Sequence, residues 1–102
     1  MLHHIVLKEP DGPQGLARIG AAMPILAAVC AALPGASGFA HGPNRDFEGK
    51  SARFAYGFSV CFTDRAAHLA YEAHPDHIRA GAMLVAACKG GHDGIFVADL
   101  EV

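Results

Sequence analysis

One stretch of strict alternation limits the fold more than any other feature of this 102-residue chain. Between Arg53 and Phe62, large apolar residues alternate with small ones, and we call the large set the aromatic stripe: Phe54, Tyr56, Phe58, Val60 and Phe62. Successive side chains of a strand point to opposite faces of a sheet, so this period of two predicts a strand with one aromatic face and one small-residue face. The aromatic face has to be covered by a second layer or by a partner.

The other elements are indicated by periodicity and by proline and glycine breaks. Runs of β-forming residues predict strands at 2–8, 36–41 and 95–102. Apolar residues three or four apart predict a helix over 14–33, although an interior proline at position 24 disfavours it. A Thr63-Asp64 cap predicts a short helix to Tyr71, and a further helix is expected over 76–88. The polar stretch 42–51 is expected to be a loop and a mobile lid.

The order of these elements predicts the fold class. The order β-α-β-β-α-α-β is the ferredoxin-like split βαβ pattern with its second helix broken in two, an α+β fold with a four-stranded antiparallel sheet. Residues 1–102 are expected to form a single domain, because a chain of this length has room for one core. Helices would cover one face of the sheet, and we expect the aromatic stripe to lie on the other, open face.

An open aromatic face predicts a homodimer, because water would otherwise cover several large apolar side chains. Two sheets meeting through their open faces would close into an α+β barrel with a pocket in each half. Two interpretations of the aromatic stripe remain open: plain dimer core, or dimer core that also lines a ligand pocket.

Composition excludes several classes of partner. The net charge of −2, with scattered Lys and Arg, offers no electrostatic footprint for nucleic acid. The chain lacks the basic amphipathic stripe that is typical of a membrane-surface helix. Its longest apolar run, 21–33, is too short to span a bilayer. Three scattered cysteines without close pairing are typical of reduced thiols, so we expect a cytoplasmic protein.

The segment 71–77, Tyr-Glu-Ala-His-Pro-Asp-His, concentrates groups suited to proton transfer. Imidazole changes its charge near neutral pH, which suits a cleft site. An ordinary interpretation is also open, because Pro75 and Asp76 suit the first turn of a plain helix.

A metal site is a weaker interpretation of the same segment. His74 and His77 could bind a cation together with His92 or Asp76, but a structural zinc site would need thiolates at tight spacing. We therefore expect neither a metal nor a cofactor. The histidines at positions 41 and 68 are expected to be ordinary surface residues.

Several motifs, in this order and spacing, resemble the stress-responsive A/B barrel family; they are His3–Leu7, Leu33-Pro34-Gly35, Val60–Asp64, Tyr71–His77 and Val97–Val102. The resemblance covers nearly the whole chain and implies a ferredoxin-like subunit and a barrel formed sheet to sheet. One plant member of that family closes a linear polyketide by aldol chemistry. Another is a ring-forming stress protein with no required catalysis.

The resemblance also implies roles for individual residues. By its pattern His77 is the catalytic base, Tyr71 helps to hold the substrate, and Asp99 orients the catalytic histidine. A histidine of the first strand lines the same cavity; the spacing favours His4, although a slip of one residue would make it His3 and reverse the face. The other expected substrate-binding residues are Val6, Tyr56, Phe58 and His74. An Asp99 carboxylate beside His77 is expected to raise the pKa of that imidazole.

Two classes of function follow as hypotheses. One is a cofactor-free cyclase or isomerase acting on a small oxo-substrate, with His77 as the base. The alternative is a non-catalytic dimer that binds a small apolar molecule or serves as a stress-associated scaffold. A cofactor-independent oxygenase is a third hypothesis, which rests on fold analogy alone.

Overall fold

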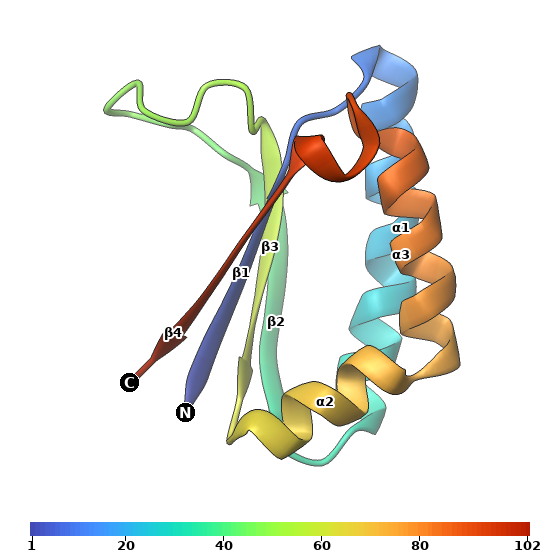
Figure 1. The fold of residues 1–102 in the computed structure, drawn as a ribbon, viewed down its shortest axis with the longest axis vertical. Coiled ribbons are helices and arrows are strands. Elements are labelled where there is room, and N and C mark those ends of the chain that lie inside the picture. Colours follow the sequence, from blue (N-terminus) through green and yellow to red (C-terminus); the bar gives the residue numbers. More distant parts are fainter.

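A four-stranded sheet packs against a layer of helices in the computed structural model, which describes residues 1–102 (Figure 1). The elements in chain order are β1 (Leu2–Lys8), α1 (Gly12–Ala32), β2 (Ala36–Pro43), β3 (Tyr56–Phe62), α2 (Arg65–Ala73), α3 (Pro75–Ala87), the 3-10 helix η1 (Gly91–Gly94) and β4 (Ile95–Glu101). The strand order is β2-β3-β1-β4, and every neighbouring pair is antiparallel. The predicted ferredoxin-like α+β fold is therefore confirmed.

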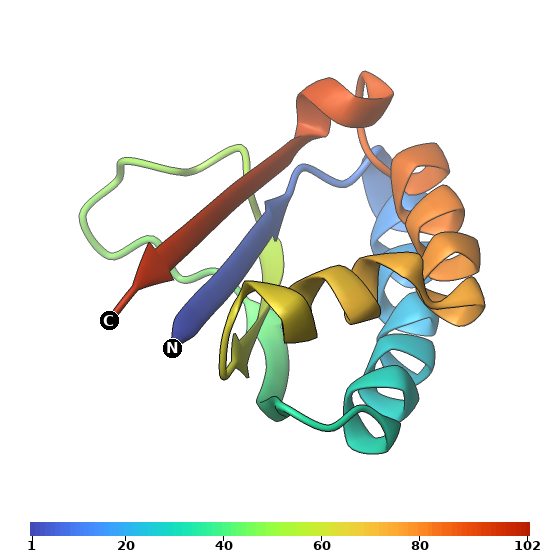
Figure 2. The same cartoon turned by 60° about the horizontal axis from the view of Figure 1, so that its bottom comes forward.

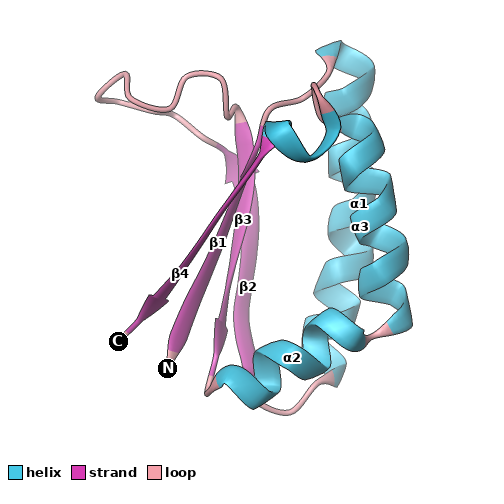
Figure 3. Ribbon diagram, viewed as in Figure 1, coloured by secondary structure: helices cyan, strands magenta, loops and turns pink.

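Helix α1 runs unbroken through Pro24 and packs along α3 on one side of the sheet (Figure 3). Pro24 is exposed, and so is Gly20, whose carbonyl loses its helical donor, so water can bind that carbonyl. By length and composition alone α1 could cross a membrane. Its buried residues, however, belong to the core of the folded chain, among them Ile19, Met23 and Leu26.

Most of the aromatic stripe lies under the helices, which contradicts the prediction that it forms the open face; only Phe54, which precedes β3, packs on the open side, against Phe96 with the ring centroids 5.9 Å apart. Phe58, Val60 and Phe62 are buried in the same core as the apolar side of α1. A strand's period of two assigns residues to two faces but does not say which face the helices cover. The large side chains take the covered face because burial there removes most apolar surface from water. The small-residue face, with Gly57 and Cys61, is the open one.

The open face of the sheet is nevertheless apolar. Leu7 of β1 pairs with Phe96 of β4, and His3 pairs with Leu100, so these side chains share the face that the helices leave bare. Phe96 and Leu100 are about half exposed, at 47% and 53%. The face available to a second subunit is therefore built from β1, β4 and the small-residue side of β3, and of the aromatic stripe only Phe54 reaches it, through its contact with Phe96.

The loop between β2 and β3 projects away from the helical layer (Figures 1 and 2). The Asp46 side chain shapes it by accepting hydrogen bonds from the backbone N–H groups of Lys50 and Ser51. Phe47 at its tip is 95% exposed. The expected role of this loop as a lid is wrong for the cavity described below, because the loop lies on the opposite side of the sheet.

Helix α2 crosses from the end of β3 to the start of α3 and closes one end of the space between the layers (Figure 2). Asp64 starts it as predicted, since its side chain accepts a hydrogen bond from the Ala67 N–H. His74 separates the two helices and caps α3, because its Nδ1 accepts from the Asp76 N–H at 3.0 Å. These two caps set the angle at which α2 presents its inner face to the sheet.

Candidate functional site

A cavity of about 410 Å³ lies between the sheet and the helices. Its walls combine apolar side chains with an unusual number of titratable ones. Those lining residues that bear on the chemistry are His4, Val6, Lys8, Leu26, Phe58, His68, Tyr71, Glu72, His77, Leu84, Val97 and Asp99. An apolar pocket with a few convergent polar groups is the usual form of a small-molecule site.

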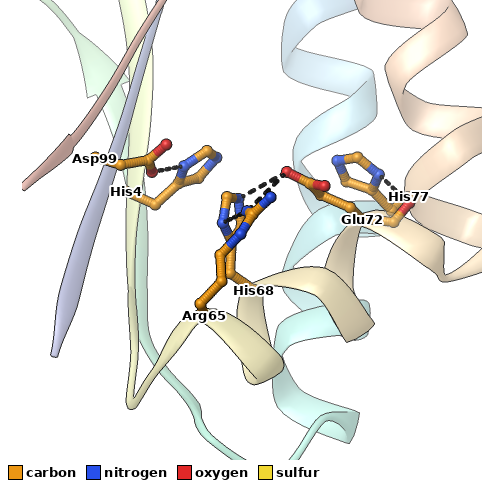
Figure 4. Close-up of polar contacts among 6 residues, drawn as sticks. All are labelled: His4, Arg65, His68, Glu72, His77 and Asp99. Carbon is orange, nitrogen blue, oxygen red and sulfur yellow. Dashed lines mark hydrogen bonds and ion pairs between the residues drawn. The ribbon is translucent and has the colours of Figure 1, made fainter.

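His4 and Asp99 form a pair across β1 and β4 (Figure 4). They are direct partners in the antiparallel register, so both side chains stand on the covered face, with His4 Nδ1 2.5 Å from Asp99 Oδ1. A carboxylate can only accept, so Nδ1–H donates. His4 is thus the histidine that faces the cavity, whereas His3 is exposed on the other face.

The predicted pairing of Asp99 with His77 is wrong. His77 lies on α3, and its Nδ1–H donates to the backbone carbonyl of Glu72 at 3.2 Å. That bond leaves Nε2 as the nitrogen with a free lone pair. The pKa of His77 is lowered rather than raised, chiefly because burial disfavours the charged ring. His77 is therefore a neutral imidazole near pH 7, already in the tautomer of a base.

His68 is a functional candidate that sequence reasoning placed on the surface. It is only 4% exposed, and its ring centroid lies 4.8 Å from that of His4. Arg65 donates to its Nδ1 at 2.6 Å, so the proton of the neutral ring sits on Nε2. Burial lowers the pKa of His68, which keeps the ring neutral. The available signal was its position three residues before Tyr71, on the same face of α2.

Two polar atoms of the cavity wall are buried without a hydrogen-bond partner: His68 Nε2 and the Tyr71 hydroxyl. Glu72 Oε1 lies 3.1 Å from His68 Nε2, which is within ion-pair distance (Figure 4). The angle at the His68 N–H is nevertheless too poor for a hydrogen bond. Tyr71 is 1% exposed, burial raises the pKa of its phenol, and its ring centroid is 4.2 Å from that of His77. Buried polar groups are almost always paired, so these two donors are available to a ligand.

Lys8 was also missed by sequence reasoning. It follows His4 and Val6 on the covered face of β1, and the alternation of that strand could have indicated its position. Its side chain lines the cavity, with Nζ 5.1 Å from the ring centroid of Phe58. The residue is 2% exposed, and burial lowers its pKa to about 8.

The structure divides the remaining predicted substrate-binding residues. Val6 and Phe58 line the cavity between the sheet and the helices, and their role in substrate binding stays a prediction. Tyr56 does not, because its hydroxyl bonds His41 Nδ1 at 2.6 Å on the side of β2. His74 does not either, because it is occupied as the cap of α3.

One group of side chains has the spacing to hold a metal ion. The ligand atoms of His4, His68 and Asp99 lie within 4.8 Å of one another. His4 and Asp99 are already joined by a hydrogen bond, and the Arg65 cation contacts His68, which opposes a second cation there. His74 and His77, the pair considered from the sequence, are not part of a group of side chains with ligand atoms this close together.

Comparisons with known proteins agree with this architecture. Residues 2–102 match the family model of the stress responsive A/B barrel domain. A dimeric ferredoxin-like protein of unknown function from Jannaschia sp. CCS1 is 56% identical, with a TM-score of 0.95 over 99% of this chain and 98% of that one. A second dimeric ferredoxin-like protein of unknown function, from Thermobifida fusca YX, is 18% identical, with a TM-score of 0.75 over 99% and 90%.

A structure of known activity shares the fold at low identity. It is the hydroxynitrile lyase from Passiflora edulis, 16% identical, with a TM-score of 0.76 over 99% of this chain and 92% of the lyase. Identity this low relates the folds and not the active sites. No curated protein matches the chain in sequence.

Proposed function

The chain belongs to the stress-responsive A/B barrel domain family, and from that premise we propose that it is a homodimeric, cofactor-free acid–base enzyme acting on a small oxo-compound. The dimeric state of the Jannaschia protein, at 56% identity, supports the homodimer. The half-exposed Phe96 and Leu100 support an interface on the open sheet face. Three free cysteines support a reducing, cytoplasmic setting.

His77 is the proposed base. The Glu72 carbonyl holds its Nδ1–H, and the lowered pKa keeps Nε2 free to accept a proton at neutral pH. This is the observation that carries the proposal, because a general base needs both the correct tautomer and a pKa at or below the working pH. In the proposed step Nε2 takes a proton from the carbon next to a carbonyl, and the C–H electron pair passes into an enolate.

Tyr71 and His68 are the proposed donors to the enolate oxygen. Both carry a buried, unpartnered hydrogen on the cavity wall, and Tyr71 lies against His77. Donors already in place where negative charge develops stabilise the transition state more than the ground state. The enolate can then recover a proton, which is isomerisation, or attack a second carbonyl of the same molecule, which is cyclisation.

His4 is the proposed second proton carrier, and Asp99 its positioning residue. The 2.5 Å contact holds the His4 ring in one tautomer, with Nε2 as its free nitrogen. Asp99 thus keeps the orienting role predicted from the sequence, but the histidine that it orients is His4 and not His77.

A non-catalytic dimer that binds a small apolar molecule is the second candidate. Leu26, Leu84 and Val97 support it, because they give the cavity an apolar wall that would retain such a ligand without any proton transfer.

Deuterium exchange separates the two candidates. Small ketones and oxo-acids that raise the melting temperature of the wild type are incubated in D₂O, and loss of the α-proton signal is followed by NMR. We expect exchange with the wild type, a loss of ~10²–10⁴-fold in His77→Ala, and no loss in His41→Ala, an exposed histidine outside the cavity. Binding without exchange by the wild type would instead establish the binding protein.

A further inference from the structure

We propose that Lys8 binds a carboxylate of the substrate, so that the substrates are oxo-acids held with the acid group at one end of the cavity and the carbonyl at the other. This inference rests on the proposed function, whose chemistry it places at the His77 end.

The Lys8 ammonium is a buried cation without a protein anion. The residue is 2% exposed, and its Nζ forms no hydrogen bond or ion pair with the protein. Nζ is not among the fully enclosed atoms without a partner, so it is open to the cavity, where it lies 5.1 Å from the centroid of the Phe58 ring and near Cys88. The nearby Cys88 thiol keeps its proton, because burial raises its pKa. Glu9, the next residue, directs its carboxylate to Arg53 at 3.7 Å. An uncompensated charge is expensive to hold in a protein interior, which indicates a ligand that supplies the anion.

Lys8 lies at the opposite end of the cavity from the acid–base groups. His4 and Lys8 stand on the same face of β1, and at about 3.3 Å per residue their Cα atoms are roughly 13 Å apart. Their functional groups are closer, because Lys8 Nζ lies 5.1 Å from the centroid of the Phe58 ring and the His4 ring centroid lies 6.1 Å from it. The His4 end adjoins His68 and hence α2, whereas Lys8 pairs with Ile95, directly after η1. Val6 and Val97, paired between them, provide an apolar middle.

This arrangement fits one chemical class of ligand. A carboxylate at Lys8, an apolar chain along Val6 and a carbonyl beside Tyr71 and His77 would together satisfy each unpartnered group of the wall. At neutral pH the amine remains mostly protonated, since its pKa of about 8 lies above 7. A charge-assisted hydrogen bond of this kind contributes about 1.5–3 kcal/mol, which is roughly a 10- to 100-fold gain in affinity.

The test compares 7-oxooctanoate with its neutral counterpart 7-oxooctanamide, by isothermal titration calorimetry at pH 7. We expect the wild type and Lys50→Met, a surface control with the same charge change, to prefer the carboxylate by roughly 10- to 100-fold. Lys8→Met, which keeps an unbranched apolar side chain, should bind both compounds equally. Equal affinities in the wild type, or a carboxylate preference that persists in Lys8→Met, would overturn the inference.

Two further readouts complete the test. Borohydride reduction of the wild type with 7-oxooctanoate should give no covalent adduct; an adduct on Lys8 would overturn the inference by making the amine a nucleophile. Deuterium exchange at the α-carbons of the same compounds tests the proposed function separately. If the wild type prefers the carboxylate, Lys8→Met does not, and no deuterium exchange occurs, the carboxylate site at Lys8 stands and the proposed enzyme activity is refuted. If acid and amide exchange equally and Lys8→Met changes neither, the enzyme activity stands and the carboxylate site is refuted.

Discussion

The buried Lys8 predicts an unusual pH dependence of stability. Its pKa is 10.5 in the unfolded chain and about 8 in the folded one, so the unfolded state binds more protons between these values. Stability must therefore rise with pH through this window. The free-energy cost of burying the charged ammonium applies in full below pH 8 and vanishes above pH 10.5. Each pKa unit corresponds to about 1.4 kcal/mol, so burial of the ammonium costs about 3 kcal/mol at pH 7.

The experiment is urea unfolding of the wild type and Lys8→Met between pH 7 and pH 10. Subtracting the two free energies of unfolding removes the titrating groups that do not interact with Lys8. The Cys88 thiol, whose pKa the Lys8 charge lowers, is the group whose contribution differs between the two proteins. We expect the wild type to gain about 2.5 kcal/mol relative to Lys8→Met over this range, and Lys50→Met to show no such change relative to the wild type. A difference between wild type and Lys8→Met that stays constant with pH would show that the ammonium is solvated or paired, and would refute the reasoning.

The other predictions concern the site, the core and the interface. Tyr71→Phe should slow α-proton exchange less than His77→Ala, because it removes one donor and keeps the ring; equal losses, measured by NMR, would contradict the assigned roles. The exchange rate should stay on its plateau down to a pH below 6.5, because the pKa of His77 is lowered; an apparent pKa above 6.5 in the pH–rate profile would exclude His77 as the base. Leu100→Asp should convert the dimer to a folded monomer by light scattering and circular dichroism, and a persistent dimer would place the interface elsewhere. Phe58→Ala should lower the free energy of unfolding by about 3–5 kcal/mol in urea, because Phe58 is core; dissociation without destabilisation would restore it to the interface.

The sequence by itself determined the elements and their order. Alternation located β3, the Asp64 cap located α2, and proline and glycine breaks separated the elements, because these signals are local properties of the backbone. The same local signals assembled the split βαβ pattern, and the motif resemblance identified the family. Six of the 16 residues that line the cavity were named from the sequence, among them His4, Tyr71 and His77.

Only the tertiary structure decided which face of each strand the helices cover and which side chains meet. Period-two alternation is symmetric between the two faces, so it could not show that Phe58 lies in the core and Leu100 on the open face. The pairing of Asp99 depends on the register between β1 and β4, which joins residues 95 positions apart in the chain. The alternation of β1 puts Lys8 on the same face as His4, and the spacing on α2 puts His68 on the same face as Tyr71, but neither signal shows that this face is covered. The burial of Lys8 and His68, and with it the lowering of their pKa values, arises only when α2, α3 and the sheet enclose them.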